Sequence, residues 1–423
     1  MASGHGMRPA DAGPQGGASA VAGAGDIESV TGFAARVLGE PPSALVEIGN
    51  GNLNQVFRAR SATESVIIKR ALPYVRSVGP SWPLTTNRVR IEADAYAVHE
   101  AVSPGSLPRL IARNDAEAMI ALEDVGTAGD WRGQLIAGAS VPGVGRAVGA
   151  YCGDIIVGTE ARRSGQDPDG PARGSDGIGA TGAAGGVNEG DRAARYREAF
   201  DDATMQRFTE RMVFRAPFEH DSSNSWPPHL RDVAARIRAD RAARDSAAKA
   251  RRLFMTSAEC LLHGDLHTGS VLADDAGGVR VIDLEFAFYG PPAFDVATFL
   301  AHLCLARIRR TVLDDGHGVA YLDRTAAEFW AELIHRLRAR ASEPHRYTGR
   351  LVSHAALFMG IELLRRIGGR FKVEDLMTLP ERPREAAERL ALGTWHDLVS
   401  SHATLRTFPE LWDRAVNSQK GYL

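Results

Sequence analysis

The sequence has little cysteine and no cysteine pattern that binds metal. Cys152, Cys260 and Cys304 stand far apart in 423 residues and form no Cys-x-x-Cys pair. An odd number of scattered cysteines indicates neither a disulfide framework nor a zinc site. Their apolar neighbours predict plain buried thiols in a reducing compartment, so we expect a cytoplasmic protein.

Long apolar runs and an excess of one charge are also missing. Arg146 and Asp154 interrupt the most apolar stretch, residues 141–157, so we expect no transmembrane helix. The first 25 residues lack the compact apolar core of a signal peptide. With 50 Lys and Arg against 52 Asp and Glu, the net charge of −2 gives no electrostatic support for binding nucleic acid or an anionic membrane.

The distribution of residue types predicts two regions of different structure. Short strands dominate the start of the chain: 45–48 and 56–59 flank a glycine turn, and Ser65–Lys69 and Met119–Leu122 follow. Amphipathic helices are expected at 27–38, 87–102 and 351–367, and helical patterns dominate the rest except for short strands near 271–272 and 279–282.

Two segments are expected to lack a packed core. Residues 1–26 are interpreted as a disordered tail, and residues 163–191, with nine glycines, as a flexible surface insertion. The predicted domains are therefore a β-rich region at 27–122 and a mostly helical region at 123–423.

The most informative stretch runs from His263 to Glu285. His263-Gly264-Asp265 begins a loop that resembles the catalytic loop of kinases, and Asp283-Leu284-Glu285 resembles their metal-binding turn. Ser270 stands where a kinase has a metal-binding Asn, and Glu285 where it has Gly. We interpret the pair of substitutions as one relocated metal ligand. Asp265 is the candidate catalytic base that orients the acceptor hydroxyl and takes its proton late.

Asp283 and Glu285 are the candidate ligands of Mg²⁺, which prefers carboxylate and phosphate oxygens. Both directly follow an apolar strand. In an extended segment residues two apart point the same way, so we expect both carboxylates to face one cavity. Alternatively, one carboxylate caps a helix and the other is a surface charge.

The strand region carries residues suited to bind ATP. Small residues between two strands let backbone N–H groups approach phosphates, although an ordinary Asn-Gly hairpin would have the same composition. Lys69 is expected to pair with the phosphates and to be held by Glu92, with Glu100 as the second choice. The glycine-loop candidates are Gly49, Asn50, Gly51, Asn52 and Asn54.

Three further residues are candidates for contact with the acceptor or the site. Trp82 lies on a proline-bracketed loop that either closes over a site or packs down. Arg365 and Arg366 end the helix 351–367, where they would simply complement the helix dipole. Adjacent helical residues point about 100° apart, so contact of both with one ligand would require partial unwinding.

With these residues in view, the chain resembles the methylthioribose kinase family. The resemblance covers about 44–160 and 199–376. Its specific phrases are Gly49 to Asn54, Leu72 to Thr85, Trp131 to Leu135, His263 to Ser270 and Asp283 to Pro291. Leu284 departs from the family, which usually has Pro there.

The resemblance implies a two-lobed, protein-kinase-like α+β fold and a role in methionine salvage. It implies ATP-dependent phosphorylation of the anomeric O1 of 5-methylthioribose with Mg²⁺, by a homodimer. Asp265 is implied as base, Lys69 as phosphate lysine, Asp283 and Glu285 as metal ligands, and Arg365 and Arg366 as sugar ligands. The adenine-binding hinge would be Leu122, Glu123 and Asp124. Alternatives are another acceptor (5-deoxyribose, an aminoglycoside or choline) and an inactive nucleotide-binding module.

Overall fold

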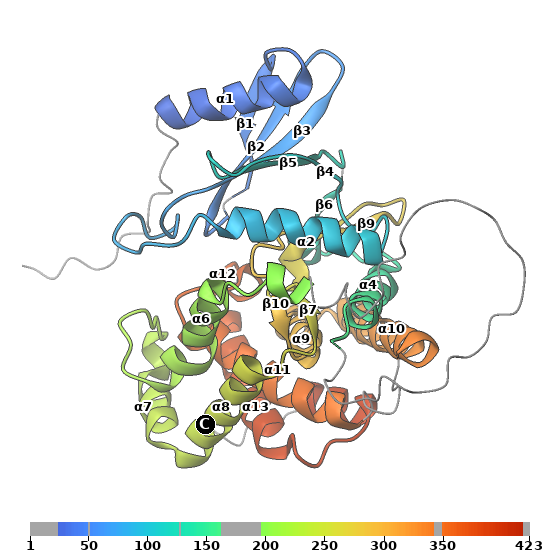
Figure 1. The fold of residues 1–423 in the computed structure, drawn as a ribbon. Coiled ribbons are helices and arrows are strands. Elements are labelled where there is room, and N and C mark those ends of the chain that lie inside the picture. Colours follow the sequence, from blue (N-terminus) through green and yellow to red (C-terminus); the bar gives the residue numbers. More distant parts are fainter. Residues whose placement is uncertain (1–23, 50, 127, 162–195, 342–348, 418–423) are drawn as a thin grey trace, which may run out of the picture. The chain divides into compact units, whose positions relative to one another are not determined.

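The computed structural model describes residues 24–49, 51–126, 128–161, 196–341 and 349–417 (Figure 1). The chain divides into two compact units. The first unit comprises the chain up to Val89 together with Ile111–Asp124, and the second comprises Arg90–Leu110 and everything from Val125 onward. Residues 90–110, which the sequence assigned to the first lobe, thus group with the second unit.

The first unit is built on a five-stranded sheet. Its strands follow the order β1-β2-β3-β5-β4, and the β1–β2, β2–β3 and β3–β5 pairs are antiparallel. Every strand predicted in this region is present, and β4 is an additional one that the sequence did not reveal. The bounds are β1 Ala44–Glu47, β2 Asn54–Arg60, β3 Ser65–Ala71, β4 Leu110–Asn114 and β5 Met119–Glu123.

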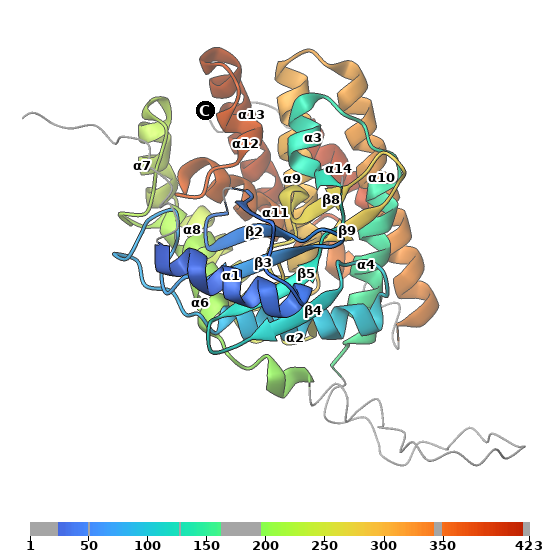
Figure 2. The same ribbon diagram turned by 90° about the horizontal axis from the view of Figure 1, so that it is seen from above.

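Helix α1 (Ala24–Leu38) packs on this sheet, as both views show (Figures 1 and 2). Its buried residues Val30 and Phe33 join Phe57 and Ile68 from the strands in one apolar core. Burying these side chains is the main force that holds a helix of this length on a sheet. The helix begins three residues before the predicted start, so residues 24–26 are helical rather than part of a tail.

The second unit is mostly helical. Together with the sheet of the first unit, it confirms the predicted α+β fold class. The helices are α2 Arg88–Val102, α3 Trp131–Ala137, α4 Val144–Gly158, α6 Thr204–Glu210, α7 Arg231–Ala239, α8 Arg241–Thr256, α9 Ala293–Val312, α10 Gly316–Arg340, α11 Gly349–Gly368, α12 Glu374–Met377, α13 Glu381–Ser401 and α14 Phe408–Val416. The predicted helices at 87–102 and 351–367 correspond to α2 and α11.

Helix α9 is the centre of the second unit. It is buried along almost its whole length, because α10, α11 and α13 all pack against it. At its N-terminal end, Phe294 lies in a cluster of aromatic rings with Phe214, Phe254 and Phe358 at centroid distances of 4.7–6.3 Å. Aromatic pairs at such distances stabilise a core beyond their buried area.

Helices α4 and α10 approach each other unusually closely (Figures 1 and 2). Gly145, Gly149 and Gly153 repeat every four residues on α4 and therefore share one face. A Cβ atom at Gly149 would overlap the carbonyl oxygen of Phe329 on α10. Only glycine permits this spacing, and Asp154 adds ion pairs to Arg336 and Arg340 of α10 at 3.2 and 2.6 Å.

Five short strands of the second unit carry the loops that contain the catalytic motifs. β7 (Cys260–Leu262) pairs with β10 (Phe288–Gly290), and β8 (Val271–Ala273) pairs with β6 (Gly129–Asp130) and β9 (Val279–Val281). The strands predicted near 271 and 279 are confirmed. β7 leads into His263, and β9 precedes Asp283, so the two motifs begin where strands end.

The remaining predictions concern segments and membranes. Residues 1–23 and the glycine-rich insertion 163–191 lie outside the described residues. Among the residues the structure describes, no helix combines the length and apolarity needed to cross a membrane. All three cysteines are buried and free, as predicted, and burial raises their pKa values.

Candidate active site

The loop around Asp265 is anchored by a carboxylate that the sequence did not single out. Asp295, in the first turn of α9, accepts hydrogen bonds from the backbone N–H groups of His263 (2.7 Å) and Gly264 (3.0 Å). Burial raises the pKa of Asp295, while His263 and these two amides oppose the rise. The sequence signal was an acidic residue at the start of a strongly apolar helix, which by itself also fits a dipole interaction.

His263 connects the catalytic loop to the metal-turn segment. Its Nε2 lies 2.8 Å from the carbonyl oxygen of Ile282, which can only accept, so Nε2 carries the proton. Nδ1 accepts from the backbone N–H of Asp265 at 3.2 Å. The backbone N–H of Ile282 also donates to the carbonyl of Ser270 at 2.9 Å. The two motifs identified in the sequence are therefore fastened together.

Gly264 is required at its position by conformation and by space. Its φ is +84°, a region that residues with a Cβ rarely adopt, and a Cβ atom would overlap the carbonyl oxygen of Phe286. The close passage of residues 264 and 286 brings the metal turn against the catalytic loop.

Ser270 makes hydrogen bonds within the catalytic loop. Its side chain is buried, and its hydroxyl donates to the carbonyl of Asp265 at 3.1 Å and lies 3.0 Å from Nδ1 of His267. The hydroxyl therefore supports the loop from inside. The assignment of the metal to Asp283 and Glu285 rather than to Ser270 stays a prediction.

The prediction that Asp283 and Glu285 lie in an extended segment is wrong. The strand ends at Val281, and Asp283 has a φ of +69°, so the segment is not extended and strand alternation does not apply. Asp is among the few residues that tolerate this conformation. The chain then turns, with the N–H of Ala287 donating to the carbonyl of Leu284 at 3.0 Å.

Asp283 and Glu285 suit Mg²⁺ by their chemistry. Glu285 is buried, and a buried carboxylate needs a cation or hydrogen bonds to offset its lost hydration. Within the described residues, no cluster of three or more His, Cys, Asp or Glu side chains is arranged to hold a metal. Mg²⁺ usually takes one or two carboxylates together with substrate phosphates and water, so Asp283 and Glu285 are sufficient as candidate ligands.

The two adjacent arginines converge on Asp265. Nη2 of Arg365 and Nη2 of Arg366 each lie 3.5 Å from Oδ1 of Asp265. Helix α11 continues to Gly368, so the expectation that joint contact requires unwinding is wrong. Their long side chains bridge the angular separation, because both are bound through Nε by Glu362, three and four residues earlier.

In the first unit, the glycine loop lies between β1 and β2. Gly49, Gly51 and Asn52 are exposed, and Gly49 has a φ of +75° with open space around it. Asn50 lies outside the described residues. An open turn of small residues is what a phosphate-binding loop requires, and it is equally compatible with a simple hairpin.

The loop that carries Trp82 is joined to the glycine loop. It folds back on itself, with the N–H of Val75 donating to the carbonyl of Trp82 at 2.9 Å. The N–H of Ser77 then donates to the carbonyl of Asn52 at 3.0 Å, and Arg76 pairs with Glu47 at 2.5 Å. Two motifs that were separate in the sequence thus form one structure. The indole of Trp82 is half-buried.

Two of the predicted ATP-binding residues have side chains that hold the first unit together. Oδ1 of Asn54 accepts from Nε of Arg88 at 3.0 Å, and the Asn54 side chain is buried. Asp124 accepts from Arg58 at 2.8 Å and from Ser65 at 2.6 Å. These contacts favour a supporting role for both side chains and leave the backbone of Leu122, Glu123 and Asp124 as the candidate hinge.

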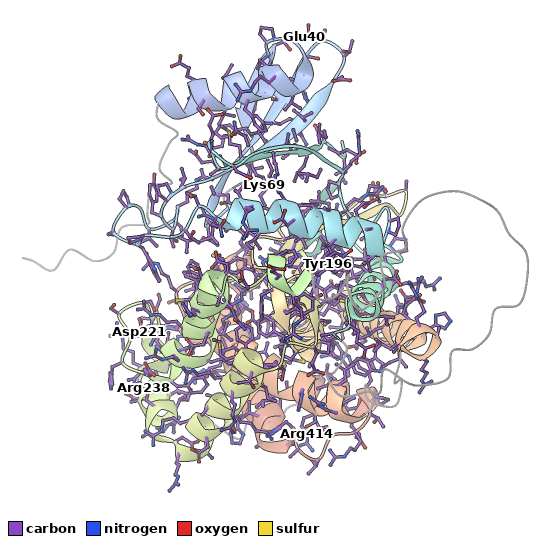
Figure 3. All side chains as sticks on the ribbon, in the orientation of Figure 1. Glu40, Lys69, Tyr196, Asp221, Arg238 and Arg414 are labelled. Carbon is purple, nitrogen blue, oxygen red and sulfur yellow. The ribbon has the colours of Figure 1, made fainter. Side chains whose placement is uncertain are left out.

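Lys69 lies in the middle of the sheet, on β3 between Val56 of β2 and Ile120 of β5 (Figure 3). It is 3% exposed, and a lysine is rarely so buried unless its ammonium group is paired with an acidic group. Glu92 is completely buried in α2, whereas Glu100 accepts from the N–H of Gly105, which disfavours it as the partner of Lys69. Lys69 belongs to the first unit and Glu92 to the second, and their pairing stays a prediction.

Comparisons with known proteins agree with these motifs. Residues 180–333 match the model of the phosphotransferase enzyme family. A methylthioribose kinase of Geobacillus sp. (strain WCH70) is 31% identical over 381 residues, covering 88% of this chain and 89% of that protein. The methylthioribose kinase of Geobacillus kaustophilus is 34% identical, covering 85% and 87%, and that of Bacillus pumilus is 32% identical, covering 82% and 85%.

A solved structure of the aminoglycoside phosphotransferase APH(4)-Ia is a more distant match, with 14% identity and a TM-score of 0.42 over 89% of this chain and 99% of that one. The identities to the curated relatives are above 30% and extend over most of both chains. The chain therefore belongs to the methylthioribose kinase family.

Proposed function

We propose that the protein transfers the γ-phosphoryl group of ATP to the anomeric O1 of 5-methylthioribose, giving ADP and 5-methylthioribose 1-phosphate for methionine salvage. The observation that carries the proposal is the convergence of Arg365 and Arg366 on Asp265. A carboxylate flanked by two guanidiniums can accept a proton from a sugar hydroxyl, while the guanidiniums donate hydrogen bonds to neighbouring sugar oxygens.

In the proposed reaction, O1 attacks the γ-phosphorus as the bond to the bridging oxygen of ADP breaks. Asp265 orients the hydroxyl and takes its proton late in the transfer, because a loose transition state builds little charge on the nucleophile. The side chain of Asp265 is 26% exposed, so it can reach a substrate. An anomeric hydroxyl is more acidic than an ordinary alcohol, which suits a weak carboxylate base.

The proposed reaction requires ATP and Mg²⁺. The glycine loop and Lys69 would hold the phosphates, and the backbone of residues 122–124 would hold adenine. When bound, Mg²⁺ supplies charge neutralisation for the phosphates, and Asp283 with Glu285 would hold it. Glu285→Gln should raise the Mg²⁺ concentration needed for half-maximal rate, and an unchanged titration would remove Glu285 from the metal site.

A kinase for a related acceptor is the second candidate. A sugar pocket discriminates only weakly against a missing methylene or sulfur, by about 1–3 kcal/mol, so 5-deoxyribose is a realistic competitor. Choline and aminoglycosides are cations, and the guanidiniums of Arg365 and Arg366 disfavour them. The homodimer and the cytoplasmic location remain part of the proposal, and the molar mass in solution tests the former.

An ADP-release assay over a panel of acceptors tests the function. The expected order is methylthioribose first, 5-deoxyribose second, and no turnover above the ATP-only background with choline or an aminoglycoside. A clear preference for either cation would contradict the proposed acceptor. If the protein binds ATP but releases no ADP with any of these acceptors, an inactive nucleotide-binding module would be favoured.

A further inference from the structure

Behind Asp265 and the two arginines lies a buried set of polar groups that the proposed reaction does not use directly. Glu362, on α11, is 2% exposed and contacts both arginines: Oε2 lies 2.5 Å from Nε of Arg365 and Oε1 lies 2.7 Å from Nε of Arg366. Each guanidinium is thus gripped at Nε, and each turns an Nη2 toward Asp265. One carboxylate sets the direction of both side chains.

The charge of Glu362 is maintained in spite of its burial. Burial alone would raise the pKa of this carboxyl group, but Arg365, Arg366 and His302 together hold it well below its usual range. Two guanidiniums side by side would repel each other without an anion between them. Glu362 therefore makes the close approach of two positive charges to one substrate site possible.

His302, on α9, supports Glu362 from behind. Its Nδ1 lies 3.1 Å from Nη2 of Arg132, and a guanidinium can only donate, so Nδ1 accepts and Nε2 carries the proton. Nε2 then donates to Oε1 of Glu362 at 3.2 Å. Burial, followed by Arg366, lowers the pKa of His302 well below its ordinary value, so the imidazole is neutral and has one defined tautomer.

Arg132 closes the set by returning to the catalytic loop. Its Nε lies 3.2 Å from the hydroxyl of Thr268 and 3.3 Å from Oδ2 of Asp375, which is completely buried. Thr268 lies three residues after Asp265. The contacts therefore form a ring from the catalytic loop through Arg132, His302, Glu362 and the arginine pair back to Asp265. This also assigns a structural reason to Arg132, which the sequence marked only through the phrase Trp131 to Leu135.

We propose that Glu362 is a positioning residue for the acceptor, which fixes the orientation of Arg365 and Arg366 toward the sugar, and that the Nε2–H of His302 holds Glu362 in place. The proposal rests on the proposed role of the two arginines as sugar ligands. The proposal predicts an effect on the acceptor and none on ATP, because every member of the ring belongs to the second unit and none is a candidate ATP ligand.

The test compares Glu362→Gln with Glu388→Gln. Glu388, on α13, is the control: it is 3% exposed and its Oε2 lies 3.2 Å from Nε2 of His229, so it is a second buried carboxylate beside an imidazole. We expect Glu362→Gln to raise the KM for methylthioribose about tenfold or more and to lower kcat, with the KM for ATP unchanged. Glu388→Gln should change neither KM, whatever its effect on Tm.

Wild-type turnover with methylthioribose in the same assay reports on the proposed function, and the ratio of variant to wild type reports on Glu362. An unchanged acceptor KM in Glu362→Gln, or an equal rise in the acceptor and ATP KM values, would overturn the inference.

If Glu362→Gln does not fold, His302→Leu and His302→Gln replace it. The leucine removes the donor to Glu362, and we expect a severalfold rise in the acceptor KM. The glutamine supplies an N–H and should restore most of the affinity. Equal kinetics in the two His302 variants would contradict the proposal.

Discussion

The candidate residues of the two units are organised differently. In the second unit, Asp265 sits on a loop whose backbone is bound by buried Asp295, and the arginines facing it are gripped by buried Glu362. In the first unit, Gly49, Gly51 and Asn52 are exposed, and a hydrogen bond from Ser77 supports this loop through its backbone.

This difference indicates a division of labour. Groups that act on a developing transition state must be held in place before the substrate arrives, and buried hydrogen bonds achieve that. A phosphate chain, in contrast, is bound by backbone N–H groups that an open glycine turn leaves accessible. We therefore expect mutations in the second unit to act on the acceptor and on stability, and mutations in the glycine loop to act on ATP.

The largest effect is expected for Asp265→Asn. The amide keeps the size of the side chain but cannot take a proton, so kcat should fall roughly 10²–10⁴-fold while nucleotide affinity stays unchanged. Turnover and nucleotide binding should be measured on the same preparation. Asp275→Asn, at an exposed position in the turn between β8 and β9, is the surface control and should keep full activity. Substantial turnover in Asp265→Asn would remove this residue from the chemistry.

The packing of the catalytic loop is tested by Gly264→Ala. Its control is Gly277→Ala, because both glycines have a positive φ, +84° and +88°, but Gly277 has open space around it. Both variants suffer backbone strain of about 1–3 kcal/mol, and only Gly264→Ala must also push back the carbonyl of Phe286. We expect Gly264→Ala to lower Tm further and to lose activity that Gly277→Ala keeps. Equal Tm values would show that crowding there is unimportant.

Alanine substitutions in two helices should have opposite signs. Gly149→Ala on α4 forces α10 away and should destabilise the protein by about 1–3 kcal/mol. Gly32→Ala on α1 finds its nearest neighbour at 3.7 Å, so the better helix propensity of alanine should stabilise by about 0.5–1 kcal/mol. Denaturant unfolding measures both. A stabilising Gly149→Ala would contradict the close contact between α4 and α10.

The smallest expected difference is in how much stability each unit loses at low pH. Burial lowers the pKa of His99 to about 3 and that of His354 to about 4, and both lie in the second unit. Such imidazoles bind protons only on unfolding, so their contribution to stability is complete above about pH 6.5 and declines as the pH falls below it.

The described residues of the first unit contain no histidine. Hydrogen exchange at pH 5.5 should therefore show a greater loss of protection in α2 and α11, which carry His99 and His354, than in β2 and β3, relative to pH 7.5. Equal losses in both regions would refute this account of the acid sensitivity.

The motifs could be recognised in the sequence because each is local. The loop 263–270 and the strand before Lys69 are recognisable from residue types within one short stretch. The support of the site could not be predicted in this way. Asp295 binds backbone groups that lie 31 and 32 positions earlier in the chain, which no local pattern reveals. Glu362 binds Arg365 and Arg366, three and four positions later, and in the sequence this looks like any ion pair between neighbours on a helix.

Two expectations failed for a common reason. The sequence assigned regular geometry to Asp283 and to the end of α11, but a positive φ altered the first, and flexible side chains removed the need for unwinding in the second. Ideal periodicity predicts where Cβ atoms point, and it does not predict where a guanidinium several bonds further along will lie.

The position of the transferred phosphate tests the central claim most directly. Phosphorylation of O1 blocks the hemiacetal, so the product of methylthioribose and ATP should no longer react as a reducing sugar, and its ³¹P resonance should couple to the anomeric proton. A product that keeps its reducing end and carries the phosphate on another hydroxyl would contradict the account.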